Sequence, residues 1–166
     1  TFQGARAFNQ QIGNWNTSRV TDMRFLFNGA IAFNQHIGNW NTSQVTNMSE
    51  MFYGATIFNQ PINTLGTRQG ESGNEWNTGA VTNMSRMFRN AQQFNQNIGR
   101  WNTSRVTDMQ HMFNGATNFN NGDWPVTVFW GLLNENEFRD FHTSTFFGPF
   151  IRRPNPRQTM NWEVGQ

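Results

Sequence analysis

Large apolar residues recur along the chain with a period of 25 residues. The string Trp-Asn-Thr occurs four times, beginning at Trp15, Trp40, Trp76 and Trp101. Each copy is followed in order by Val-Thr, a Met and a pair made of Leu or Met and then Phe. The first two are 25 residues apart, as are the last two, whereas the middle gap of 36 is one period plus an insertion of 11. A fixed period of this length is typical of a repeat protein.

One half of each repeat has helical spacing. In the second complete repeat, four apolar residues occupy positions i, i+3, i+7 and i+10: Val45, Met48, Phe52 and Ala55. This spacing predicts a helix of about three turns with one apolar stripe. Gly54, near the end of the stripe, is expected to terminate the helix in a left-handed conformation.

The other half of each repeat alternates with period two. Phe58, Gln60 and Ile62 alternate with polar neighbours, which predicts a short strand. Each repeat is therefore expected to contain one helix and one short strand, and the fold class is an α/β repeat solenoid. Because one unit cannot bury its own apolar stripe, we expect stacked copies to place Phe on Phe, Met on Met and Trp on Trp.

The repeat pattern divides the chain into two regions. Residues 1–124 carry the repeats, interrupted by a polar, glycine-rich insertion at 65–75, and residues 125–166 lack the pattern. We expect 125–166 to form an irregular C-terminal cap or a docking tail, since solenoids need atypical terminal units; a disordered or mistranslated tail is the alternative. Residues 1–5 align with 26–30, so the chain is expected to begin within a repeat, with at least part of another repeat upstream.

The full repeat string is W-N-T-S-x-V-T-[DN]-M-x-x-M-F-x-G-A-x-x-F-N-Q-x-I. It resembles the BspA-like leucine-rich repeat family over residues 1 to about 120. The resemblance implies a leucine-rich-repeat-like solenoid in a cell-surface or extracellular protein that acts in adhesion and protein binding. It carries over no catalytic residues, because the family motif is structural.

The composition argues against several classes of function. Only 13% of the residues are charged, the net charge is +2, and all 12 cations are arginine, so a nucleic-acid partner is not expected. The chain has no cysteine and no run of apolar residues long enough to cross a membrane. The three histidines lie far apart in the sequence, so we expect no metal site. The acidic residues show no repeated paired spacing, and no Ser-His-Asp or phosphate-loop motif appears, so we expect no cofactor and no enzymatic activity.

Three sets of residues are candidates for binding a protein partner. Outward positions of the predicted strand would form a solvent-facing polar strip, and the alternative is an ordinary sheet face with asparagine ladders: Asn34, His36, Asn59, Asn95 and Asn97. The insertion contributes Arg68 and Glu71, since loops carry specificity; a tolerated insertion is the alternative. The tail contributes an aromatic and a basic pair: Phe146, Phe147, Arg152 and Arg153.

The sequence leaves more than one function open. We expect a non-catalytic protein-binding or adhesion module displayed on a cell surface. The alternative is a structural or accessory subunit packed among neighbouring subunits of a larger assembly, such as a virion, a surface layer or an organelle complex. An exposed aromatic tail would favour this alternative, because large apolar patches usually become covered. Binding of ice or carbohydrate by regular Thr and Asn rows is a third possibility.

Overall fold

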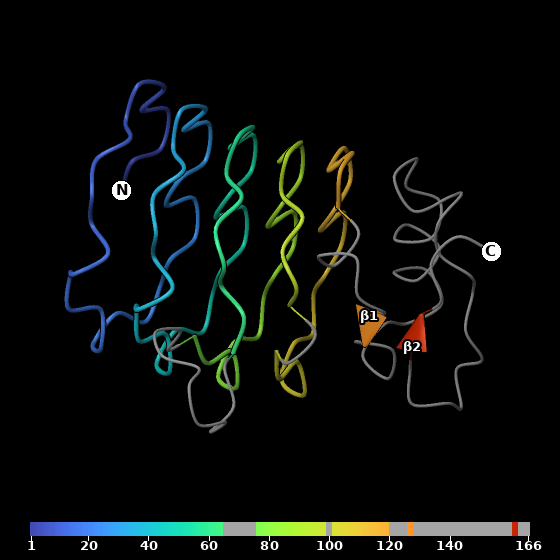
Figure 1. Cartoon of the computed structure of the whole chain (residues 1–166). Helices are drawn as coiled ribbons and strands as arrows, with labels where there is room; N and C mark the ends of the chain where they lie inside the picture. The colour runs from blue at the N-terminus through green and yellow to red at the C-terminus, as the bar shows by residue number, and fades with distance from the viewer. Residues whose placement is uncertain (65–75, 99–100, 120–125, 128–160, 163–166) are drawn as a thin grey trace.

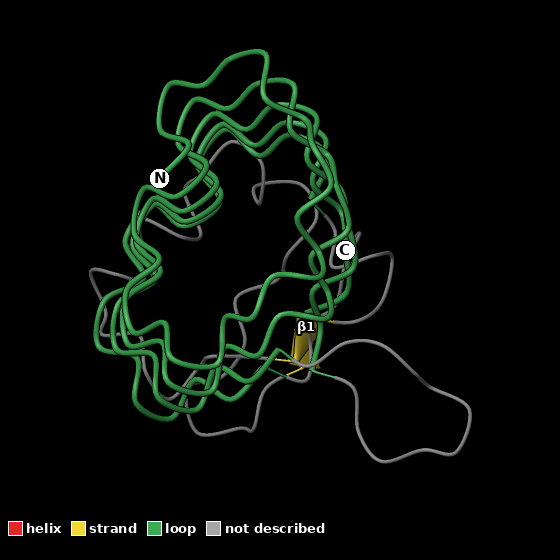
Figure 2. Cartoon of the chain, turned by 90° about the vertical axis from the view of Figure 1, so that its left-hand side faces the viewer, coloured by secondary structure: helices red, strands yellow, loops and turns green. Residues whose placement is uncertain are grey.

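The repeats form a stack of coils. The computed structural model describes residues 1–64, 76–98, 101–119, 126–127 and 161–162, and the coils lie side by side along the molecule (Figure 1). Figure 2 looks along the stack and shows that successive coils follow nearly the same outline. We number the coils from the amino terminus as coil 1 (1–25), coil 2 (26–50), coil 3 (51–64 and 76–86), coil 4 (87–98 and 101–111) and coil 5 (112–119).

Regular secondary structure is almost absent from the described residues. The two strands are β1 (Val126–Thr127) and β2 (Asn161–Trp162), which pair antiparallel with Val126 opposite Trp162. Neighbouring coils are joined by isolated parallel bridges that run from Asp22 through Asn47 and Asn83 to Asp108. No helix occurs within the described ranges. The predicted α/β repeat solenoid of leucine-rich-repeat type, with one helix and one strand per repeat, is therefore wrong.

Consecutive turns replace the predicted helix. In coils 2 and 3, the N–H groups of Met51, Tyr53 and Ala55 each donate to the carbonyl three residues earlier, at 3.0–3.2 Å. The backbone is left-handed at Glu50 (φ 54°) and Gly54 (φ 66°), the third residues of two of these turns, as in a type II turn. An α-helix cannot pass through two left-handed residues. Tandem turns nevertheless return side chains to one side every three or four residues, which explains the helix-like spacing.

The remaining N–H groups of this segment join the coils. Glu50 N donates to Ser85 O at 2.9 Å, Phe52 N to Met87 O at 2.9 Å and Gly54 N to Arg89 O at 2.8 Å. Alternate backbone donors thus close a turn within a coil or bond to the next coil. This division satisfies the backbone without a helix and fixes the register between neighbouring repeats.

The predicted strand at 58–62 is also wrong. Asn59, within it, bonds to a side chain of the preceding coil and not to a backbone carbonyl: its N–H donates to Asn34 Oδ1 at 2.9 Å. Asn34 N and Asn95 N do the same with Asn9 Oδ1 and Asn59 Oδ1, both at 2.9 Å. In this segment a side-chain amide occupies the place that a backbone carbonyl takes in a sheet.

Stacked phenylalanines fill the core. Phe52 lies between Phe27 and Phe88, with ring centroids 5.6 and 5.4 Å away and rings within 14° of parallel. It also stacks on Phe58 of its own coil at 4.1 Å. The predicted stacking of Phe on Phe is confirmed. Full burial of each such ring contributes about 1.5–3 kcal/mol of hydrophobic free energy, so each coil is stabilised by its neighbours.

The tryptophans pack and also donate to the preceding coil. Trp40, Trp76 and Trp101 are buried, and each indole Nε1–H donates to an isoleucine carbonyl one coil earlier, at 2.8–3.0 Å. Trp76 and Trp101 stack with centroids 5.9 Å apart, as predicted for Trp on Trp. A buried indole N–H needs an acceptor, and the coil repeat supplies one at the same place each time.

Several predictions fall largely or wholly outside the described ranges. They include the insertion at 65–75 and nearly all of the tail at 125–166, so the proposed division into 1–124 and 125–166 stays a prediction. In the part of the chain that the structure describes, no helix is long and apolar enough to cross a membrane.

Candidate functional site

The polar strip predicted from the sequence lies along one side of the stack. Its asparagines belong to an amide ladder, which we define as the aligned residues Asn9, Asn34, Asn59 and Asn95 with the glutamines that follow them: Gln35, Gln60 and Gln96. Each ladder residue lies on the coil next to its equivalent. The structure thus brings Asn34, Asn59 and Asn95 together in one row.

Asn9, Asn34 and Asn59 each accept hydrogen bonds from two groups of the following coil. Asn34 Oδ1 accepts from Asn59 N at 2.9 Å and from Gln60 Nε2 at 3.0 Å, and Asn34 O accepts from Gln60 Nε2 at 3.1 Å. Asn59 makes the same three contacts with the next coil, at 2.9–3.0 Å. The carbonyl oxygens of these side chains are therefore committed to holding coil on coil. The ladder's first contribution is structural.

A second row flanks the ladder and changes its chemistry at every coil. This outer row consists of Gln11, His36, Pro61 and Asn97, which stand at equivalent repeat positions. The first three are exposed and Asn97 is half-buried. The predicted residues His36 and Asn97 thus lie beside the ladder, on the same side of the molecule. Amide, imidazole and pyrrolidine side chains follow one another on a nearly constant backbone.

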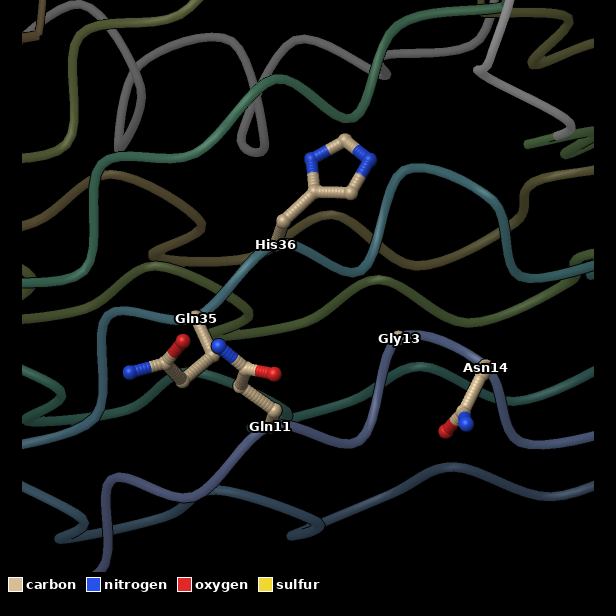
Figure 3. Close-up of a pocket in the computed structure, with 5 residues that line it drawn as sticks. All are labelled: Gln11, Gly13, Asn14, Gln35 and His36. Atoms are coloured by element: carbon tan, nitrogen blue, oxygen red, sulfur yellow. The ribbon is translucent and has the colours of Figure 1, made fainter.

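The outer row opens into a shallow depression between coils 1 and 2 (Figure 3). Its volume is about 350 Å³, and its lining is mainly amide and imidazole: Gln11, Gly13, Asn14, Gln35 and His36. In Figure 3 the imidazole of His36 extends away from the amides of Gln11 and Gln35. These groups offer both donors and acceptors without a carboxylate, so the depression suits a neutral polar ligand or an exposed peptide backbone.

Gly13 sets the shape of this depression. A Cβ at Gly13 would lie 2.5 Å from the carbonyl oxygen of His36, a contact that the backbone of coil 2 would have to relieve. The close approach of the two coils here therefore requires glycine. Gly13 and Asn14 were not predicted as site residues. The available signal was a glycine two residues before each of Trp15 and Trp40, namely Gly13 and Gly38.

Charged groups are sparse on the described surface. The described residues form two ion pairs, Arg24–Asp22 at 2.9 Å and Arg86–Glu50 at 3.3 Å. No group of three or more His, Asp or Glu side chains gathers at a metal-binding distance within the described ranges. The other predicted site residues lie outside the described residues: Arg68, Glu71, Phe146, Phe147, Arg152 and Arg153.

Comparison with known proteins places the repeats in a family. No curated protein and no solved structure matches the chain. A family model described as "Mycoplasma protein of unknown function, DUF285" matches residues 1–74 and 69–130, which together span most of the sequence. The chain therefore belongs to the DUF285 family.

Proposed function

We propose that the chain is a non-catalytic protein-binding module of a cell-surface protein, with repeats of the BspA-like type, and that it acts in adhesion. Two observations support the repeat type: the Trp-Asn-Thr string recurs four times, and the DUF285 family model covers the same repeats. Surface display follows from the resemblance to BspA-like proteins. Protein binding has separate support in the arrangement of the side chains.

The observation that carries the proposal is the contrast between the amide ladder and the outer row. Ladder residues are the same in each coil because each must bond to the next coil. The outer row beside them differs in every coil, from Gln11 through His36 to Pro61. A constant scaffold with a varied, solvent-facing row is how stacked repeats form an extended binding surface.

A first experiment tests surface display. The chain has no lysine, so a membrane-impermeant reagent that couples to carboxylates is suitable, with its 10 acidic residues as targets. The proposal predicts that the native protein is labelled on intact cells as fully as after lysis. Labelling that requires lysis would contradict surface display and would favour a subunit inside a larger assembly.

A second experiment tests binding by the outer row. Carboxylate-directed crosslinking of native material is followed by mass spectrometry, and saturable binding to the recovered partner is then measured. We expect the double variant Gln11→Ala/His36→Ala to bind at least about tenfold more weakly, with an unchanged melting temperature. Gln44→Ala, an exposed amide outside the row, is the matched control. Equal binding by both variants, or adducts only between copies of this chain, would contradict the proposal.

A further inference from the structure

The tandem turns present a second varied surface. We define the turn strip as the side chains that two neighbouring turn positions direct outward on coils 2 to 4: Asn28, Glu50, Tyr53, Arg86 and Arg89. The contacts between these residues join positions that are 22 or 36 apart in the sequence, and those of Glu50 with Arg86 and of Tyr53 with Arg89 cross to the next coil. All five residues stand at variable positions of the repeat string, so the string itself does not single them out.

Two contacts hold Glu50 within the turn strip. Its Oε2 accepts from Asn28 Nδ2 at 3.1 Å, and its Oε1 accepts from Arg86 Nη1 at 3.3 Å. The Glu50 side chain is 22% exposed, whereas that of Arg86 is 46% exposed. The acid is thus enclosed and shared between two donors, while the arginine that it orients keeps most of its donors toward solvent.

Arg89 is ordered without a carboxylate. Its guanidinium carbon lies 5.7 Å from the centroid of the Tyr53 ring, a cation–π distance. Neither described ion pair includes Arg89, and its Nε is buried without a hydrogen-bond acceptor. Enclosing a charged donor without a partner costs free energy. An acidic ligand would remove this cost, since a small rotation of the side chain would present Nε and Nη together to a carboxylate.

Left-handed backbone recurs at one turn position of each repeat, including two positions of the turn strip. The four equivalent turn residues have left-handed φ angles of 53° to 59°: Phe25, Glu50, Arg86 and His111. Glycine or asparagine adopts this region with less strain, and Asn90 and Gly54 do so at the neighbouring turn position. Glu50 and Arg86 nevertheless occupy it with long charged side chains. Phe25 and His111, outside the turn strip, are equally left-handed, so the strain belongs to the repeat, and the contacts of the strip carry the inference.

We propose that Tyr53, Arg86 and Arg89 form a recognition site for an acidic segment of the partner protein. This inference rests on the proposed binding function and names the chemistry of one contact. Arg89 binds a carboxylate side-on over the Tyr53 ring, and Arg86, oriented by Glu50, takes a second acidic group. The two arginines and one acid leave a net charge of +1 on the strip, which complements an acidic segment. Tyrosine and arginine are also the residues enriched where interfaces gain most of their affinity.

The test uses a fluorescein-labelled hexaglutamate peptide, with hexaglutamine as the neutral comparison, and fluorescence anisotropy as the readout. We expect saturable binding of hexaglutamate alone, weakening as salt is raised because the contact is electrostatic. Arg89→Gln should weaken binding at least about tenfold, and Arg89→Lys should restore little, since lysine lacks the planar fork. Tyr53→Phe keeps the ring and should change affinity less than about threefold.

Arg105→Gln is the matched control, because it removes the same charge from an exposed arginine outside the strip. Equal losses for Arg89→Gln and Arg105→Gln would overturn the proposal, since only overall charge would then matter. Equal binding of hexaglutamine would also overturn it, as would tighter binding of inorganic tripolyphosphate or a single-stranded oligonucleotide. A melting temperature measured for each variant identifies any loss that comes from unfolding, and Arg86→Gln then supplies an independent measurement.

The same variants separate this inference from the proposed function. If Arg89→Gln leaves binding to the native partner unchanged while Gln11→Ala/His36→Ala abolishes it, the site fails and the binding function stands. If hexaglutamate binds in an Arg89-dependent way but the chain has no surface partner, the proposed function fails. The acidic ligand of the turn strip then comes from a source other than a surface partner.

Discussion

The two sides of each coil satisfy their backbone in different ways. On the turn side, Phe52 N donates to Met87 O of the next coil, so backbone meets backbone. On the amide-ladder side, Asn95 N donates to Asn59 Oδ1, so a side chain supplies the acceptor. The turn side therefore tolerates different residues at its outward positions, as the turn strip demonstrates. The ladder side requires asparagine, because removing the amide removes a bond between coils.

The core beneath the turns should show the largest effect of substitution. Phe52→Ala removes a ring that stacks on Phe27, Phe58 and Phe88 and is completely buried. We expect the free energy of unfolding to fall by about 3–5 kcal/mol, measured by chemical denaturation. Phe52→Leu, which retains most of the apolar volume, should cost less. Similar losses for the two variants would contradict this prediction, because they would mean that the apolar volume kept by leucine contributes little and that the stacked ring contributes nearly all.

The amide ladder should come second. Asn59→Ala removes the acceptor of Asn95 N and of Gln96 Nε2, leaving a half-buried backbone donor without its partner. The expected loss is about 1–3 kcal/mol. Asn59→Asp is the informative companion, since a carboxylate keeps an acceptor at the same place and should retain more stability. If Asn59→Ala unfolds at the same denaturant concentration as the natural chain, the ladder does not hold the coils together.

A matched substitution at a junction where backbone bonds to backbone should cost less. Thr46 Oγ1 donates to Thr21 O at 3.2 Å, but the same carbonyl also accepts from Thr46 N at 2.8 Å. Thr46→Ala therefore removes a second, exposed bond and leaves the backbone pair intact. We predict a loss below about 1 kcal/mol in the same unfolding assay. A loss equal to that of Asn59→Ala would mean that side-chain and backbone junctions between coils respond alike to losing a side-chain bond.

The smallest effect is expected within the turn strip. Arg86→Asn places a residue that tolerates left-handed backbone at φ 53° while it removes a partly exposed ion pair with Glu50. The relief of strain and the lost pair oppose each other, and each amounts to less than about 1 kcal/mol. Stability should change by no more than about 0.5 kcal/mol, while hexaglutamate affinity falls. A large loss of stability would show that Arg86 is a scaffold residue.

The sequence predicted the register of the fold better than its local structure. The spacing of Trp76 and Trp101 was sufficient to predict their stacking, because equivalent residues of stacked repeats must meet. The helix prediction failed at Glu50 and Gly54: tandem turns produce the same apolar spacing, and a left-handed Glu has no clear signature in the sequence. The left-handed backbone predicted at Gly54 is confirmed (φ 66°), but the residue belongs to a turn and not to the end of a helix.

The candidate site was predictable only in part. Outward polar positions followed from the period-two pattern, which correctly aligned Asn34 with Asn59. Their hydrogen bonds did not follow from it, since a side-chain acceptor and a strand partner leave the same sequence pattern. The turn strip was not foreseen because its contacts, such as Arg86 with Glu50, join residues 36 positions apart that differ in every repeat.

Along the polar side of the stack, side-chain amides join the coils in place of a strand ladder. Scalar coupling across hydrogen bonds, measured by NMR on isotope-labelled protein, tests it directly. The structure predicts coupling between the amide nitrogen of Asn95 and the side-chain carbonyl carbon of Asn59. The nitrogen lies 2.9 Å from the Oδ1 atom bonded to that carbon. Coupling from Asn95 N to a backbone carbonyl of the preceding coil would contradict the account and restore the strand.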